Sequence, residues 1–164
     1  MNILAIDPGN IESAYCLIDT ENYKPIEFGK VENQYLKGWL SLNAERYDKC
    51  VIEMIASYGM AVGESVFQTC VWIGRFTQVA EYEEKDVDYI YRKEEKMNLC
   101  GSMRAKDSNI RQALIDRFAK FDFKNGKGTK KEQDFFYGFS KDVWASFAVG
   151  VTYIDKIKEM REVK

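Results

Sequence analysis

The chain has 164 residues, of which 46% are apolar and 30% are charged, and its formal net charge is −2. This length and composition suit one compact domain and exclude a disordered chain, and no apolar run approaches the length of a bilayer span. The sequence contains no histidine. Histidine-based triads, haem with a histidine ligand and H-E-x-x-H zinc sites are therefore excluded, so hydrolytic chemistry must come from carboxylates.

The four cysteines lie far apart in the sequence and form no C-x-x-C pair: Cys16, Cys50, Cys70 and Cys100. This spacing argues against a zinc ribbon or a thioredoxin-like motif and predicts reduced, mostly buried thiols. The chain reaches Asp7 before a basic segment or a long apolar stretch develops, which is unlike a secretory signal. We therefore expect a cytoplasmic protein that does not enter the membrane.

The first half of the chain predicts four strands and two helices. Apolar or alternating runs bounded by turn-forming residues indicate strands at Asn2–Ile6, Ser13–Asp19, Ile26–Val31 and Lys49–Met54. Apolar residues at helical spacing indicate helices at Gln34–Leu42 and about Val62–Tyr82. The first three strands are expected to form an antiparallel meander.

The second half predicts one more strand and two more helices. The strand is expected at Val87–Tyr91, one helix from Asp107 or Ser108 to about Lys120, and the last helix from near Lys141. A meander followed by alternating strands and helices predicts an α/β protein with a mixed five-stranded sheet and helices on both faces. We expect residues 1–164 to form a single domain.

The charges are unevenly distributed along the chain. A net charge of −2 argues mildly against nucleic-acid binding. Acidic residues, however, cluster at Glu81–Glu84, whereas basic residues recur from Arg92 to Lys131, so a locally basic face is possible. Within that stretch Lys127 and Lys130 alternate with glycine and could hold phosphates as a flexible arm, although a solvated loop is the commoner meaning of such a run.

Three acidic residues occupy similar places in the predicted architecture. Asp7 follows the first strand, Glu53 closes the fourth, and Asp142 opens the last helix. If the first and fourth strands are neighbours, their ends bring these carboxylates together, and their repulsion requires a raised pKa or a cation. Two Mg²⁺ ions about 4 Å apart would relieve the repulsion and activate a water for phosphodiester hydrolysis. Oxygen ligands suit Mg²⁺ or Mn²⁺ better than zinc.

Each acidic residue also has a simpler interpretation. An aspartate before Pro-Gly, such as Asp7, is often only a turn residue. Asp142 alone is most simply a helix N-terminal residue that the helix dipole favours. Glu53 is harder to explain this way, because it interrupts an apolar run and its burial needs partners. The joint pattern carries the prediction.

Several motifs resemble the RuvC-type Holliday junction resolvases of the ribonuclease H-like superfamily, in particular the phage-encoded members. The run ILAIDPG, which ends at Gly9, resembles their opening strand, and Val51-Ile52-Glu53 resembles their second acidic motif. The runs NLCGSMRAKDSNIRQAL, which begins at Asn98, and KDVWASFAVG, which begins at Lys141, resemble their basic segment and their final acidic helix. The resemblance spans nearly the whole chain and keeps the order of elements.

The resemblance implies a ribonuclease H-like fold and a Mg²⁺- or Mn²⁺-dependent endonuclease that acts on branched DNA, encoded by a phage, a prophage or a bacterial host. It implies that Asp7, Glu53 and Asp142 are catalytic metal ligands and that Lys106 lies near the scissile phosphate. It also implies a homodimer, for which the helix from Val62 is the expected interface, although the small and apolar residues of this helix could equally be buried within one subunit. Weaker candidates for DNA contacts are Arg104, Asn109, Arg111 and, in the loop before that helix, Tyr58, which could instead pack over the helix start.

One position departs from the family's pattern. The final helix usually carries a second aspartate one turn after the first, and here Ala145 occupies that place. Three ligands then suffice, or another acid such as Asp134 substitutes, or the chain is weakly active. Asp134 is more simply a solvated loop residue, and Asp107 and Glu64 are further acids that could approach the site.

Three other functions compete with junction resolution. A nuclease of the same fold acting on flaps or RNA–DNA hybrids shares the chemistry, and a junction-binding protein without cleavage is compatible with Ala145. A sugar-kinase or actin-like ATPase also opens on a strand that ends in aspartate. Those ATPases need two such domains and a phosphate-binding Gly-Thr turn, whereas this chain is short and has Asn10-Ile11-Glu12 at that place.

Overall fold

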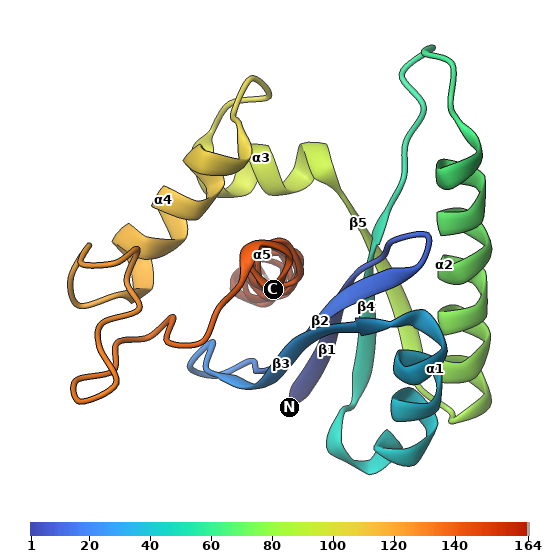
Figure 1. The fold of residues 1–164 in the computed structure, drawn as a ribbon, viewed down its shortest axis with the longest axis horizontal. Coiled ribbons are helices and arrows are strands. Elements are labelled where there is room, and N and C mark those ends of the chain that lie inside the picture. Colours follow the sequence, from blue (N-terminus) through green and yellow to red (C-terminus); the bar gives the residue numbers. More distant parts are fainter. Residues whose placement is uncertain (164) are drawn as a thin grey trace.

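The computed structural model describes residues 1–163, which fold around a twisted five-stranded sheet (Figure 1). The strands are β1 (Asn2–Asp7), β2 (Glu12–Asp19), β3 (Pro25–Glu32), β4 (Lys49–Met54) and β5 (Asp86–Tyr91). Their order across the sheet is β3-β2-β1-β4-β5. Strands β1 to β3 pair antiparallel, whereas β4 runs parallel to both β1 and β5. The predicted mixed sheet with an opening meander is therefore confirmed.

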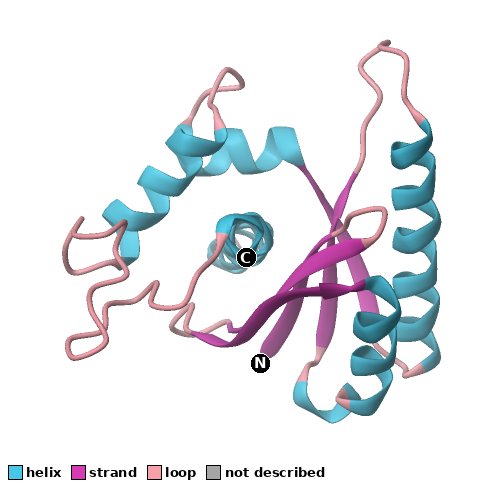
Figure 2. Ribbon diagram, viewed as in Figure 1, coloured by secondary structure: helices cyan, strands magenta, loops and turns pink. Residues whose placement is uncertain are grey.

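Helices cover both faces of the sheet (Figure 2). They are α1 (Asn33–Leu42), α2 (Glu64–Tyr82), α3 (Arg92–Cys100), α4 (Asp107–Phe118) and α5 (Lys141–Glu162). Helices α1 and α2 pack on one face, and α5 packs on the other beneath α3 and α4 (Figure 1). Short loops join most elements, but the segment 119–140 between α4 and α5 is long and contains no helix or strand.

The core has two halves because neighbouring side chains of a strand point to opposite faces of the sheet. In β1, Ile3 and Ala5 belong to the half covered by α5, whereas Leu4 and Ile6 belong to the half covered by α1 and α2. All four side chains are completely buried. Strand β1 therefore lies between the two halves of the core, and Asp7 is its last residue.

Helix α5 lies unusually close to the sheet at Gly150. A Cβ atom at this position would collide with the side chain of Ile18 and lie 3.1 Å from Cβ of Ala5. Glycine therefore permits a close approach of the helix backbone to β1 and β2. This contact holds the N-terminal turn of α5 beside the end of β1.

All five strands and four of the helices agree with the prediction, but α3 was missed. Its sequence, RKEEKMNLC, has no apolar stripe, and its buried residue is the charged Glu95. Polar contacts define the helix instead. Glu94 accepts a hydrogen bond from the backbone N–H of Tyr91 over 2.8 Å and pairs with Lys156 of α5 over 3.1 Å. Hydrophobic periodicity cannot detect a helix of this kind.

Some element boundaries and the burial of the cysteines differ from expectation. Helix α2 begins at Glu64 rather than near Val62, and α4 ends at Phe118 rather than near Lys120. All four cysteines are free, but only Cys16 and Cys50 are buried, so the prediction of mostly buried thiols holds for half of them. No helix within residues 1–163 is both long enough and apolar enough to span a bilayer.

Candidate active site

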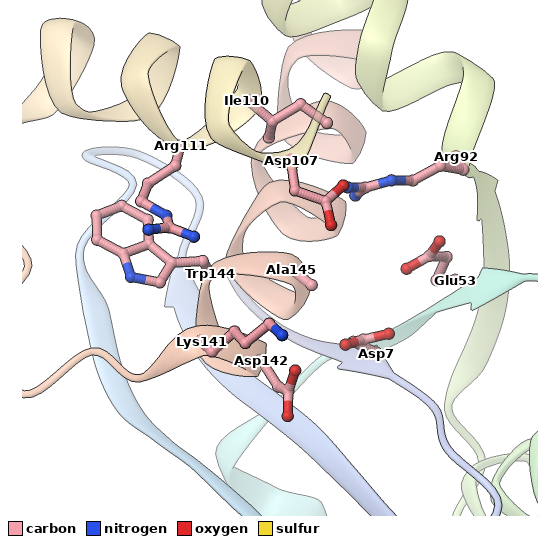
Figure 3. A pocket seen from close by; sticks show the side chains of 10 residues that line it. All are labelled: Asp7, Glu53, Arg92, Asp107, Ile110, Arg111, Lys141, Asp142, Trp144 and Ala145. Carbon is pink, nitrogen blue, oxygen red and sulfur yellow. The ribbon is translucent and has the colours of Figure 1, made fainter. Parts of the chain in front are cut away.

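A pocket of about 270 Å³ opens where β1 and β4 end and α5 begins (Figure 3). Its lining is dominated by charged side chains, with a smaller apolar part, and consists of Asp7, Glu53, Arg92, Asp107, Ile110, Arg111, Lys141, Asp142, Trp144 and Ala145. These residues come from β1, β4, α3, α4 and α5. Elements that are distant in the sequence thus meet around one charged cavity.

The three acidic residues that the sequence singles out all lie on this pocket. Strands β1 and β4 pair in parallel up to Ile6 and Ile52, so the next residues, Asp7 and Glu53, lie next to each other at the same end of the sheet. Asp142 is the second residue of α5 and approaches from the helix that crosses the sheet. Convergence of the three therefore follows from the parallel pairing of β1 with β4 and from the docking of α5.

The two carboxylates on the strands are destabilised by their surroundings. Burial, followed by repulsion from Glu53 and Asp142, raises the pKa of Asp7 to about 8. Burial also raises the pKa of Glu53, although the nearby Arg92 partly opposes this rise. Two half-buried carboxylates next to each other require a proton or a cation to be stable. The pocket is therefore electrostatically prepared to take up positive charge.

Asp142 forms an ion pair with Lys30, a residue of β3 that does not line the pocket. Its Oδ2 lies 2.7 Å from Nζ of Lys30 on β3, and the same Nζ lies 3.5 Å from Glu12. Within residues 1–163, no three acidic or cysteine side chains lie close enough together to hold one metal ion. Asp7 and Glu53 thus form the prepared part of the site, and Asp142 would join them on leaving Lys30.

The sequence analysis did not identify a second group of charged residues at the pocket, which is centred on Arg92. Arg92, the first residue of α3, donates to Glu95 over 2.6 Å and also to Asp107 of α4. Glu95 is completely buried beneath it. Burial, followed by repulsion from Glu53, raises the pKa of Glu95 to about 9 against the opposing effect of Arg92. Because α3 has no apolar pattern, only the unusual density of charges at Arg92–Glu95 could have indicated this group.

Of the predicted DNA contacts, Arg111 lies in the pocket. Its guanidinium lies 5.9 Å from the centre of the Trp144 ring, and its Nε is buried without a hydrogen-bond partner in residues 1–163. Lys106 is exposed and does not line the pocket, but it precedes Asp107 directly. Its backbone N–H donates to Oδ1 of Asn109 over 2.8 Å, so Asn109 caps the start of α4.

The remaining candidates lie on exposed loops. Arg104 is exposed in the turn before α4, and Tyr58 is 64% exposed in the loop between β4 and α2, so Tyr58 does not pack over the helix start. Lys127 is half-buried and Lys130 is exposed in the segment 119–140, away from the pocket lining. That segment is more ordered than a flexible arm, because Gly128 and Gln133 pair across it.

None of the acids considered as a replacement on the final helix takes the place of Ala145, which itself lines the pocket. Asp134 lies away from the pocket and accepts hydrogen bonds from the backbone N–H groups of Lys120 and Phe121. Glu64 is exposed and accepts a hydrogen bond from Gln68. Asp107 does enter the pocket, but its carboxylate pairs with Arg92. Of the three acids that could approach the site according to the sequence, only Asp107 therefore lines the pocket.

No protein-family model matches the sequence, and no curated protein matches it. Solved structures do resemble the fold. Thermus thermophilus RuvC superposes with a TM-score of 0.71 at 14% identity, covering 97% of this chain and 96% of RuvC. RuvC of the same organism in complex with a Holliday junction gives a TM-score of 0.72 at 13% identity, again over 97% and 96% of the two chains.

A eukaryotic enzyme shows the same similarity. The yeast mitochondrial Holliday junction resolvase Ydc2 superposes with a TM-score of 0.62 at 12% identity, covering 98% of this chain and 83% of Ydc2. The chain therefore has the ribonuclease H-like fold of the RuvC-type resolvases, and the fold that the sequence motifs predicted is confirmed. At these identities the similarity establishes the fold, while activity depends on the site.

Proposed function

We propose that this protein is a divalent-metal-dependent endonuclease that cleaves branched DNA, with the Holliday junction as its main substrate. The observation that carries the proposal is the meeting of Asp7, Glu53 and Asp142 at one pocket of a RuvC-type fold. One of the similar structures holds RuvC on a Holliday junction, which supports branched DNA as the substrate class. Hydrolysis without histidine also requires carboxylates and a cation.

The donor set of the pocket fits a hard divalent cation. Asp7 and Glu53 supply carboxylate oxygens whose raised pKa values signal unbalanced negative charge, and Asp142 supplies a third carboxylate. Such oxygen ligands favour Mg²⁺ or Mn²⁺. When bound, the metal lowers the pKa of a coordinated water and neutralises charge on the phosphate, and a second ion would share these tasks.

The chain's own residues position the reacting groups. In hydrolysis, a water oxygen adds to phosphorus, one P–O ester bond breaks, and the proton released by the water balances the proton that the leaving oxygen takes up. Asp7 and Glu53, once ionised, accept hydrogen bonds from this water and orient it. Arg111 and Lys141 on the pocket rim attract the flanking phosphates. Tyr58, exposed on the loop that follows β4, stacks on a base of the opened junction.

We also propose that two copies pair through α2. Phe67 and Val71 lie one helical turn apart and are 62% and 52% exposed, which is unusual for apolar residues of a helix that packs on a sheet. A two-fold dimer would present two pockets to a two-fold four-way junction.

Two experiments test this pairing. Phe67→Glu should give a folded monomer by light scattering, and a bismaleimide should link two wild-type chains through the exposed Cys70. A wild-type chain that is monomeric at micromolar concentration would contradict this pairing.

Cleavage of a synthetic four-way junction tests the main proposal. Wild-type protein with Mg²⁺ or Mn²⁺ should introduce paired nicks near the branch point, and chelation or the Asp7→Asn substitution should abolish them. A flap, an RNA–DNA hybrid and a linear duplex, tested side by side, separate junction resolution from other nucleases of this fold. Tight junction binding without nicks under all metal conditions would instead support a binding protein, the alternative with which Ala145 is compatible.

A further inference from the structure

Arg92 lines the pocket next to Asp107 (Figure 3). Two carboxylates that differ sharply in exposure hold its guanidinium. Its Nη1 donates to Oε2 of Glu95 over 2.6 Å, and its Nη2 donates to Oδ1 of Asp107. The Glu95 side chain is fully buried, whereas the Asp107 side chain is 79% exposed. The hydrogen bond to Glu95 is therefore shielded from water, whereas the hydrogen bond to Asp107 is open to it.

This asymmetry decides which partner can be exchanged. An exposed ion pair contributes little to stability, because water screens the charges and competes for the donors. Separation from Arg92 would leave Oε2 of the fully buried Glu95 without its hydrogen-bond donor, which is costly. Arg92 therefore stays with Glu95, while its Nη2 can leave Asp107 for another anion that enters the pocket.

Packing alone is a poor explanation for Glu95. An apolar side chain would fill a fully buried position of α3 at lower cost than a carboxylate. In addition, Oε1 of Glu95 is buried and has no hydrogen-bond partner among residues 1–163. A carboxylate that stabilises the fold poorly but fixes an arginine at the wall of a charged pocket is typical of a functional arrangement.

Ala145 also lines the pocket, at the place where the resemblance expects a carboxylate. Helix α5 therefore supplies one carboxylate to the pocket, Asp142, while α3 supplies the guanidinium of Arg92. We propose that Arg92 is a catalytic residue that binds a non-bridging oxygen of the scissile phosphate through Nη2, and that Glu95 is the positioning residue that holds it there. The inference rests on the proposed nuclease function and assigns a residue to it.

Arginine suits this task chemically. Its planar guanidinium matches phosphate oxygens, and its charge does not depend on pH in the working range. Negative charge on the non-bridging oxygens must be stabilised as water adds to phosphorus, so a donor that is already in place lowers the barrier. Asp107 keeps Nη2 oriented before the substrate enters and then yields it to the phosphate.

Kinetic measurements on substituted chains test the assignment. Arg92→Ala should lower kcat for junction cleavage by about 100-fold or more, and Arg92→Lys by roughly tenfold, because lysine keeps the charge but loses the planar donor pair. Glu95→Gln should lower kcat with KM changed less than about twofold, and combined with Arg92→Ala it should add little. Arg161→Ala, at the exposed far end of α5, is the matched control and should behave as wild type.

A modified substrate supplies a second measurement that a purely structural role would not affect. Replacement of the mapped scissile phosphate by a neutral methylphosphonate should weaken junction binding by the wild-type chain in Ca²⁺. The same replacement should weaken binding by Arg92→Ala much less, because the lost contact is shared. If the two changes act independently and their fold-effects multiply, Arg92 does not contact that phosphate and the proposal fails.

Loss of stability is distinguished by removing both charges at once. Arg92→Met combined with Glu95→Met leaves no unpaired buried charge, so this chain should fold and show a thermal midpoint near that of wild type. It should still lose cleavage to the extent of Arg92→Ala, and full activity of the double variant would overturn the proposal. A wild-type chain that cuts no branched DNA refutes the nuclease function itself, whereas a wild-type chain that cuts while Arg92→Ala cuts equally well refutes only this assignment.

Discussion

Asp7 at the end of β1 and Asp155 on α5 are both partly buried, but their electrostatic surroundings are opposite. Asp155 on α5 accepts two hydrogen bonds from Arg117 over 2.7 and 2.8 Å, one from Tyr23 over 2.7 Å and one from Asn98 over 2.8 Å. Burial alone would raise its pKa, but these donors lower it. Asp7 instead faces Glu53, and its pKa is raised to about 8.

The comparison separates charge that stabilises the fold from charge that we propose serves chemistry. Around Asp155 every carboxylate oxygen is matched by donors, so the group fixes α3, α4 and the β2–β3 turn against α5. Around Asp7 the same fold leaves negative charge uncompensated, which costs stability and is retained where a ligand completes the balance. Substitution of the two aspartates should therefore have opposite effects on activity and stability.

The largest effect is expected at Asp7. Asp7→Asn should lower junction cleavage by about 1,000-fold or more, because it removes one of the proposed metal ligands. The same substitution removes repulsion with Glu53, so its thermal midpoint without metal should equal or exceed that of wild type. Cleavage assays and calorimetry on one preparation measure both quantities. A destabilised Asp7→Asn chain would show that this carboxylate serves the fold.

Asp155→Asn should show the reverse pattern. Its loss of charge weakens the bonds from Arg117, Tyr23 and Asn98, and the free energy of unfolding should fall by about 1–3 kcal/mol, a range that allows for partial exposure of Arg117. Cleavage at a temperature where the variant is folded should stay within about twofold of wild type. Denaturant unfolding monitored by circular dichroism gives the first number, and a normal unfolding midpoint would remove the contrast.

The pH dependence of stability should distinguish the two aspartates next. An unfolded aspartate has a pKa of about 4, whereas that of Asp7 is about 8. Between these values the folded chain keeps a proton that the unfolded chain has lost, so the stability contributed below pH 4 is lost as pH rises to about 8. Thermal midpoints of metal-free wild type should fall across this window relative to Asp7→Asn. Saturating Mn²⁺ should remove the difference, and parallel pH curves without metal would contradict the assigned pKa.

The smallest effect concerns Lys30, which holds Asp142 at 2.7 Å. Lys30→Gln should free Asp142 to join Asp7 and Glu53, so Mn²⁺ affinity should rise by no more than about fivefold, since both partners are partly exposed and such pairs contribute about 0–1 kcal/mol. Titration calorimetry measures this change. Lys24→Gln, on an exposed turn, is a matched charge control. Weaker Mn²⁺ binding by Lys30→Gln would show that the lysine assists the site.

Much of the fold could be predicted because its strands and most helices carry apolar periodicity, as in Ile3–Ile6 and Phe76–Ala80. The positions of Asp7, Glu53 and Asp142 followed from their places at the ends of such elements. Helix α3 could not be predicted, because Arg92 and Glu95 are polar residues whose burial depends on contacts with α4 and α5. The orientation of Asp142 toward Lys30 was equally inaccessible, since it depends on the position of β3 in three dimensions.

The most direct test of a metal-dependent site is to locate the ion. In crystals grown with Mn²⁺, an anomalous difference map recorded at the manganese absorption edge should show a peak within about 2.3 Å of carboxylate oxygens of both Asp7 and Glu53. Asp142 should turn from Lys30 toward that peak. A map with full manganese occupancy elsewhere and no peak between Asp7 and Glu53 would contradict the account.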